Sequence, residues 1–500
     1  MPSRINEIFS LGNQTLFRFA LLLSLLPVWL STYPPMVDLP QHAGQITALQ
    51  EIWGGNPVFT DVFEVNWFTP YLVGYLLVYV LSLVMPVIIS MKLVITAVCV
   101  SIPLLTGMLL REAGADERWK WLAIPSAFGY TFYWGFFNYL VAIPFGLLFL
   151  VLTVRFNRNC SLVTGLGIAL YAIFLFFCHI LALGFTSLLA LTYLAGANYK
   201  NPRQLVLRFL PYTAPLPLIV LWMSFTHGNE SLASQGNILY GEAIDRVVII
   251  LRQFSGSQLT TDSYAAFLPG LLVSALIAGF PLLAGARPSL RPERWLPFVT
   301  GTAVFLAFPY YVFGTYHLYQ RFAVFLVPLW FMAWNSPEPR PAKRQWLAIS
   351  VIFLCAFVNI YRFAAFDRET QGLDRVLATM EPGKKVLQMT VDKRSQHFAD
   401  IVYEHFGMWY EVRHRGITEF NFAYFFPEMV RYKKGEHSKY SAGFGNHPRD
   451  FDWVANNGQS YDYFIVRAET DMRAPLFKDR QDAVELETRE GNWWLYRRAE

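Results

Sequence analysis

The dominant pattern along the first 366 residues is a series of long apolar segments separated by short polar loops. A helix needs about 20 apolar residues to cross the hydrocarbon core of a bilayer. Ten segments approach this length and are interpreted as membrane spans: 15–33, 66–86, 88–110, 161–178, 180–197, 208–226, 264–285, 295–313, 321–336 and 346–366. The first is expected to be a retained helix, because no small-residue cleavage site follows it.

The stretch 121–154 contains no charged residue and fits either two short spans or one span with a broken portion. Loop charge bears on this choice. Four loops are basic and are expected in the cytoplasm: Arg155 and Arg158; Lys200, Arg203 and Arg208; Arg287, Arg291 and Arg294; Arg340, Lys343 and Arg344. Loop 34–65 has four acidic residues and no Lys or Arg, so it is expected outside, together with loop 227–263.

These assignments require an odd number of crossings between residues 65 and 155. We therefore expect 121–154 to cross once, with a broken or re-entrant portion near 129–138. Such backbone is tolerated in a membrane only when it is buried in protein or lines a cavity. The total is eleven spans, with thirteen as the alternative.

Composition separates the tail from this body. Charged residues number 42 among the last 134 positions and 35 among the first 366. We predict a helical polytopic membrane domain over 1–366 and an external soluble α/β domain over 367–500. In the tail we expect strands at 384–391 and 461–467, a hairpin over 483–497, a helix at 395–409 and mostly loop at 421–457.

Overall composition excludes a fully soluble enzyme, a disordered chain and a collagen-like chain. Hydrophobic residues make up 54% and charged residues 15% of the chain, against about 25% charged in soluble domains. The net charge of +5 is interpreted as a topology signal, and no nucleic-acid partner is expected. The four cysteines show no CxxC spacing, so neither a disulfide framework nor a zinc knuckle is expected.

The first external loop carries the most informative residues. Asp38 stands among three prolines that restrict the backbone around it. Residues 41–53, which include His42, are expected to form a short helix along the membrane interface. A carboxylate at this boundary suits general-base catalysis. The alternative is that Asp38 caps the N-terminus of the following helix, and the residues alone leave both interpretations open.

Other polar residues are expected near the outer face. Arg321 begins a span and, with His317, is a candidate to hold a lipid-linked phosphate; the alternative is an interfacial anchor in the aromatic belt. His179 lies at an outward turn, where an ionisable group is a functional candidate, although a hydrogen-bonded structural histidine is the commoner case. Asp245 lies on a predicted amphipathic helix together with Glu242, Arg246 and Arg252. This helix would either close over an acceptor site or present a solvated face, and the solvated face is favoured.

The tail string HFADIVYEH places His397, Asp400, Glu404 and His405 at approximately helical spacing. Such groups are able to bind zinc, but no HExxH signature is present, and an ordinary amphipathic helix is favoured. The chain contains no P-loop, GxGxxG or GxSxG context. This argues against nucleotide-driven transport and serine hydrolysis.

A short cytoplasmic start, one span and an external loop that opens with Asp38-Leu39-Pro40-Gln41-His42 resemble the GT-C superfamily. Its members include protein O-mannosyltransferases, oligosaccharyltransferases and aminoarabinose transferases, which take a sugar from a polyprenyl-phosphate carrier at the outer face. The string is similar to that of a bacterial branch with an Asp-x-Pro-x-His type of loop. The resemblance covers the architecture of most of residues 1–366 and depends mainly on one acid in the expected loop.

The resemblance implies that Asp38 matches the loop-one acid, which is a catalytic base or a metal ligand in various members. A second acid is common on a later membrane segment that faces the same cavity. The corresponding stretch here, GFFNYLVAIPFG, offers Asn138 instead. An amide cannot act as a base, but it can orient a substrate or ligate a cation. This stretch therefore does not supply the second carboxylate of a two-carboxylate mechanism.

Two hypotheses follow. The favoured one is a glycosyltransferase of the plasma (inner) membrane, with a cytoplasmic N-terminus and an external tail, in which Arg321 holds the phosphate and Asp38, supported by His42, deprotonates or orients the acceptor. A divalent cation is optional, and the sugar and acceptor are not defined. The alternative is a non-catalytic GT-C-like membrane protein, a carrier of lipid or sugar or an assembly partner, which Asn138 favours. The chain lacks the inverted repeats of many transporters, which favours the enzyme.

Overall fold

The computed structural model describes residues 10–226, 238–256, 264–312, 314–336, 342–436 and 447–499. Parts of the predicted loop 227–263, namely 227–237 and 257–263, and Arg340 lie outside these residues. The chain forms two compact units. Unit 1 comprises Met1–Pro27, Ile95–Phe132 and Asn138–Tyr361; unit 2 comprises Val28–Val94, Tyr133–Phe137 and Arg362–Glu500. The first loop (34–65) thus belongs to the same compact unit as the tail, and a domain boundary after residue 366 stays a prediction.

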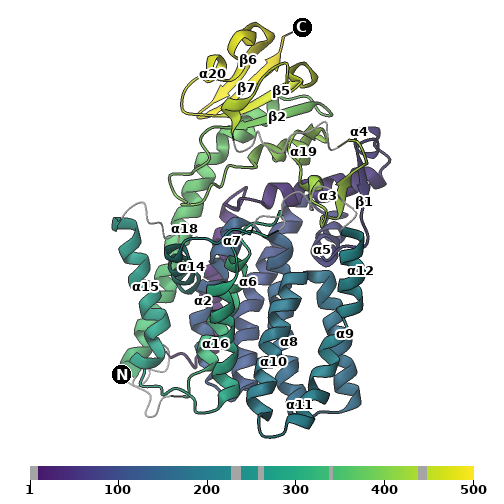
Figure 1. Cartoon of the computed structure of the whole chain (residues 1–500). Coiled ribbons are helices and arrows are strands. Elements are labelled where there is room, and N and C mark those ends of the chain that lie inside the picture. Colours follow the sequence, from purple (N-terminus) through teal and green to yellow (C-terminus); the bar gives the residue numbers. More distant parts are fainter. Residues whose placement is uncertain are drawn as a thin grey trace. The chain divides into compact units, whose positions relative to one another are not determined.

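Helices make up most of unit 1, and some of them continue into unit 2. They are α2 (Gln14–Leu30), α6 (Val87–Glu112), α8 (Phe137–Arg158), α9 (Leu162–Cys178), α10 (Ile180–Asn198), α11 (Pro202–Phe209), α12 (Leu216–Thr226), α14 (Ala243–Ser255), α15 (Tyr264–Leu283), α16 (Pro292–Ala307), α17 (Ala323–Met332) and α18 (Ala342–Thr379). Within unit 1, α10 packs against α9 and α16, and α16 packs against α17. Helices α9, α10 and α16 are labelled in Figure 1.

Five helices among the described residues are long and apolar enough to cross a membrane: Val87–Glu112, Phe137–Arg158, Ile180–Asn198, Pro202–Phe225 and Gln345–Thr379. Shorter apolar helices lie at Gln14–Leu30, Leu72–Ser82, Leu162–Cys178 and Leu268–Leu283. Many of their large side chains are exposed, for example Val220 at 66%, as expected for a surface that lipid covers. The protein is therefore membrane-embedded, while eleven spans and the orientation of the termini stay predictions.

The stretch 121–154 contains the broken portion that the sequence predicts. Two 3-10 helices, Glu117–Ala123 (η1) and Pro125–Phe128 (η2), and the short α7 (Tyr130–Trp134) precede α8. Gly135 separates α7 from α8 with φ of 80°, a left-handed conformation that favours glycine. Only α8 in this stretch, all of which the structure describes, is long and apolar enough to cross a membrane.

Unit 2 contains a five-stranded sheet in the order β3-β2-β5-β7-β6. The strands are β2 (Lys385–Thr390), β3 (Ile417–Thr418), β5 (Tyr463–Arg467), β6 (Val484–Glu490) and β7 (Trp493–Arg498). Strand β2 pairs in parallel with β3 and β5, whereas β7 pairs antiparallel with β5 and β6. The strands predicted at 384–391 and 461–467 and the hairpin over 483–497 are confirmed.

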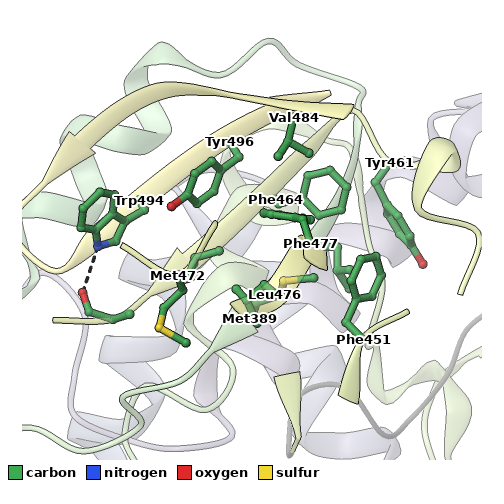
Figure 2. Close-up of a cluster of buried hydrophobic side chains, with 13 residues drawn as sticks. Met389, Phe451, Tyr461, Phe464, Met472, Leu476, Phe477, Val484, Trp494 and Tyr496 are labelled. Atoms are coloured by element: carbon green, nitrogen blue, oxygen red, sulfur yellow. Dashed lines mark hydrogen bonds between the residues drawn. The ribbon is translucent and has the colours of Figure 1, made fainter. Parts of the chain in front are cut away.

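A hydrophobic cluster covers one face of this sheet (Figure 2). Side chains of β2, β5 and β7 meet residues that follow β5, including the short helix α20 (Arg473–Phe477). Phe477 lies 5.0 Å from Phe464 and 5.5 Å from Tyr496 between ring centroids. All five residues of β5 are buried, which explains its continuous apolar run.

The helix predicted at 395–409 is wrong. Residues 395–405 form turns, followed by a 3-10 helix, Phe406–Met408 (η5), and by α19 (Trp409–His414). Tyr403 instead stacks on Phe366 of α18 at 5.4 Å, and the Arg467 guanidinium lies 3.7 Å from its ring centroid. Tertiary packing of these large side chains overrides the local helical pattern. The spacing of HFADIVYEH therefore does not place its polar residues on one helix face.

The first loop itself forms three elements, α3 (Leu39–Trp53), α4 (Pro57–Thr60) and β1 (Phe63–Val65). Helix α5 (Leu72–Ser82) follows them, and strand β4 (Val430–Tyr432) comes from the tail. Strand β4 lies in the segment predicted to be mostly loop, and it pairs antiparallel with β1. The first loop and the tail are thereby joined by backbone hydrogen bonds.

Candidate functional site

Asp38 immediately precedes α3, at the N-cap position. Its side chain makes no capping hydrogen bond with the helix, so the capping alternative is wrong. The backbone around it is held by the last two residues of α7, because Val37 N and Asp38 N donate to Tyr133 O and Trp134 O, each at 3.0 Å. The Asp38 side chain is 13% exposed.

Helix α3 begins and ends close to where the sequence predicts, but its surroundings differ. Every residue from Leu39 to Leu49 is buried, and the helix packs against α5, α19, β1 and β4 of unit 2. An interfacial helix keeps a polar face in water. The prediction that this helix lies along the membrane interface therefore conflicts with its burial.

His42 lies one helical turn after Asp38, with His42 N donating to Asp38 O at 3.1 Å. Its Nδ1 is 2.7 Å from the hydroxyl oxygen of Tyr75, and that hydroxyl donates to the Glu428 carboxylate. The three side chains are buried. Nothing in the local sequence signals Tyr75 or Glu428, since they lie 33 and 386 residues from His42 along the chain.

Two glutamines of α3 hold the tail segment that carries Glu428. Gln41 donates to Phe420 O and accepts from Phe422 N, each at 3.0 Å. Gln45 donates to Val430 O at 3.1 Å and accepts from Val430 N at 2.8 Å. Each side-chain amide thus donates to a backbone carbonyl of the tail and accepts from a backbone N–H, as a neighbouring strand would. The segment is fixed against the helix at both ends.

A second histidine approaches Asp38. His405 Nε2 lies 3.6 Å from Asp38 Oδ1, which is longer than a hydrogen bond. Burial, aided by the Lys393 charge, lowers the pKa of His405 to about 3. The His405 ring in this contact is therefore uncharged at neutral pH. An adjoining cavity of about 10 Å³ is lined in part by His405, Glu404 and Glu419, and it has room for about one water molecule.

In unit 1, His317 and Arg321 share the loop between α16 and α17. His317 Nδ1 is 2.9 Å from the Tyr130 hydroxyl and Nε2 is 3.3 Å from the Tyr310 hydroxyl. Arg321 Nε donates to His317 O at 3.3 Å. Burial, aided by the Arg321 charge, lowers the pKa of His317 to about 3, so this ring is neutral. His317 also has φ of 59°, a strained conformation of the kind that clusters at functional sites.

Helix α14 contributes two buried arginines to this region. The Arg246 guanidinium lies 3.9 Å from the Tyr319 ring centroid and donates to Phe305 O at 2.5 Å. Arg252 lies 5.0 Å from the Tyr130 ring centroid. Asp245 is exposed. The predicted solvated face is therefore wrong for the two arginines. They pack inward because aromatic rings and backbone carbonyl oxygens stabilise their positive charge.

Asn138 lies in the first turn of α8, where the sequence suggested a second acid. It is 2% exposed, and neither atom of its amide has a hydrogen-bond partner among the described residues. The hydroxyl of the next residue, Tyr139, is likewise unpaired within that part of the chain. A buried unpaired polar group costs about 1–3 kcal/mol. Such groups in a native fold call for an explanation, and a bound ligand is one.

His179 connects to the same region through Tyr139. The two rings meet edge to face at 5.0 Å, and Arg321 lies close enough to Tyr139 to interact with it electrostatically. His179 Nδ1 accepts a hydrogen bond from Leu181 N at 3.2 Å and so caps α10. The structural interpretation of His179 is therefore confirmed, and a role in substrate binding stays a prediction.

The structure thus groups the predicted residues into two sets, one in each unit. Unit 1 holds Arg321 and His317 in contact, with His179 and Asn138 adjoining Tyr139, and with Asp245 interacting electrostatically with Tyr310. Unit 2 holds Asp38 and His42 one helical turn apart.

No group of three or more His, Cys, Asp or Glu side chains that could hold a metal ion occurs among the described residues. This holds for the tail string HFADIVYEH and for the surroundings of Asp38. No catalytic step is assigned to a cation.

No family model and no curated protein match this chain. Among solved structures, the chain is similar to ArnT from Cupriavidus metallidurans, in a crystal structure bound to undecaprenyl phosphate. The match covers 96% of this chain and 97% of that chain, at 10% sequence identity and a TM-score of 0.40. Values of this size assign no function, so the protein's own residues must support one.

Proposed function

We propose that this protein transfers a sugar from a polyprenyl-phosphate carrier to an acceptor at the outer face of the membrane. The observation that carries the proposal is the polar network of unit 1. There the Arg321 guanidinium, a neutral histidine and two tyrosine hydroxyls lie in one network. Arg321 also interacts electrostatically with Tyr139, the residue that follows the buried Asn138. The long apolar helices of the same unit suit the lipid tail of such a carrier.

The chemistry of this network fits a phosphate. The Arg321 guanidinium presents a planar set of donors that matches phosphate oxygens. Tyr130 and Tyr310 add hydroxyls on either side of His317, and they bring no negative charge that would repel an anion. The Asp245 carboxylate is exposed. The network therefore favours an anionic group over a cationic one.

Asp38 and His42 of unit 2 are proposed to act on the acceptor. The Asp38 carboxylate does not cap α3, and it deprotonates or orients the acceptor hydroxyl with support from His42. The hydroxyl oxygen forms a bond to the anomeric carbon of the sugar while the bond from that carbon to the phosphate oxygen breaks. The electron pair leaves on the phosphate, whose charge a guanidinium is able to stabilise. The leaving group needs no proton.

Carrier binding tests the phosphate half. The purified protein in detergent is titrated with undecaprenyl phosphate, and bound lipid is measured by native mass spectrometry. Arg321→Gln is expected to weaken binding by about 10- to 100-fold, since a hydrogen bond to a charged group contributes about 1.5–3 kcal/mol. Arg111→Gln is the matched control, because Arg111 is an exposed arginine of unit 1 that pairs with Glu117. Equal binding by the two variants would remove Arg321 from the site.

Donor consumption in cells tests the catalytic half even though the sugar is not identified. Cells whose protein carries Asp38→Asn are expected to accumulate an unconsumed polyprenyl-phosphate sugar, detected by mass spectrometry of lipid extracts, at an unchanged membrane level of the protein. Asp61→Asn, an exposed acid of the same loop, is expected to leave the lipid profile unchanged. Normal consumption with Asp38→Asn, at normal protein level, would support the non-catalytic alternative.

A further inference from the structure

The buried chain from His42 through Tyr75 to Glu428 has a defined direction. The Tyr75 hydroxyl donates its hydrogen bond to Glu428, and a tyrosine has only one hydroxyl proton. Toward His42, 2.7 Å away, the Tyr75 oxygen is therefore an acceptor. His42 Nδ1 must then carry the proton in this contact, and the lone pair of the neutral ring lies on Nε2.

The surroundings make this arrangement rigid. The ring of His42 lies 5.4 Å from Phe422 and 5.9 Å from Phe137 between centroids. Tyr75 is fully buried in α5, and Glu428 is 5% exposed. Glu428 is held opposite α3 by two sets of contacts. Gln41 and Gln45 bind the backbone on either side of it, and β1 pairs with β4. The His42 ring is thus held through Nδ1 and by its aromatic neighbours.

We infer that Tyr75 and Glu428 are positioning residues, which hold His42 in the Nδ1–H tautomer so that Nε2 accepts the proton of the acceptor hydroxyl. The inference rests on the proposed function and deepens it, because it assigns the proton to His42 and leaves Asp38 to orient the acceptor. The hydroxyl proton moves to Nε2 as the oxygen bonds to the anomeric carbon and the phosphate departs. The imidazolium that forms is stabilised by the Glu428 charge through Tyr75.

A spectroscopic test addresses the tautomer independently of activity. The full-length protein is labelled with ¹⁵N-histidine, and the His42 signals are identified by their loss in His42→Gln. The wild-type protein is expected to show a protonated Nδ1 and an unprotonated Nε2. Tyr75→Phe is expected to abolish this preference. A protonated Nε2 in the wild-type protein overturns the inference, whatever the activity.

Tyr496→Phe is the matched control for the spectrum. Tyr496 is also a buried tyrosine of unit 2 that donates to a carboxylate, with its hydroxyl 2.6 Å from Asp471 Oδ1. The residue packs in the hydrophobic cluster of the sheet, which contains neither His42 nor Tyr75. Its substitution is expected to leave the His42 signals unchanged, and an equal change in both variants would indicate a general loss of structure and overturn the specific assignment.

Donor consumption separates this inference from the proposed function. His42→Gln is expected to lower turnover by about 10²- to 10⁴-fold, the usual contribution of a general base, and Tyr75→Phe by on the order of 10-fold, since the base remains but its orientation is lost. Normal turnover with His42→Gln, alongside loss with Asp38→Asn, overturns the inference and leaves the proposed function standing. Normal turnover with both variants overturns both.

Discussion

Gly135→Ala is expected to destabilise the protein by displacing the backbone that carries Asp38. Gly135 has φ of 80°. A Cβ atom at this position would lie 2.9 Å from Asp38 N and 3.0 Å from Leu39 N. Both are backbone atoms, which cannot rotate away as a flexible side chain does. The new methyl group must therefore push the start of α3 away from the segment after α7.

The expected cost has two parts. The left-handed conformation alone costs about 1–2 kcal/mol for a residue with a Cβ atom. Displacement also weakens the two hydrogen bonds that Val37 N and Asp38 N donate to Tyr133 O and Trp134 O, each with a net contribution of about 1 kcal/mol. The total is about 3–4 kcal/mol, of which roughly half comes from the close approach.

Gly383→Ala isolates the first part. Gly383 belongs to the same unit and has φ of 72°, and its Cβ atom would meet nothing within 4 Å. The apparent unfolding midpoint of each variant is measured in detergent by tryptophan fluorescence at one heating rate. With about 2–4 °C per kcal/mol for a domain of 150–250 residues, the midpoint with Gly135→Ala is expected to fall about 4–8 °C below that with Gly383→Ala. Equal midpoints would refute the close approach as a determinant of the Asp38 position.

Three further predictions concern unit 2. Burial raises the pKa of Glu411 to about 8 from its ordinary 4.5, so between these values the folded state binds a proton that the unfolded state lacks, and stability is expected to fall as pH rises. Glu411→Gln should reduce the change of the unfolding midpoint with pH between pH 6.5 and 8.5, and an unchanged slope would contradict this. Glu369→Gln is expected to cost about 3 kcal/mol, because it removes the 3.1 Å ion pair of the buried Arg467; a midpoint equal to that of the wild type would show that the pair contributes nothing. Phe477→Ala is expected to cost about 3–5 kcal/mol through the cavity it leaves, whereas Val454→Ala, at a site that is 72% exposed, should stay within about 0.5 kcal/mol; a similar loss in both would exclude cavity formation as the cause.

Local patterns in the sequence determined the elements whose stability is itself local or repetitive. Apolar runs long enough for a bilayer indicated the membrane-embedded body, and the charged tail indicated a different environment for residues 367–500. The strand 461–467 followed from a short apolar run and the hairpin near Gly491 from its turn residues, and the structure has them as β5, β6 and β7. The broken portion before α8 followed from the charge parity of the loops together with the absence of charged residues in 121–154.

Only the tertiary structure decided which distant residues meet. The segment 395–405 has helical spacing, yet it forms turns, because Tyr403 and its neighbours are buried against α18 and β7. Asp38 has the sequence of an N-cap, but its side chain makes no cap. Glu428 reaches His42 through Tyr75 only because Gln41 and Gln45 bind the tail segment. Such pairings depend on long-range closure of the chain, for which a local pattern of hydrophobic and polar residues carries no information.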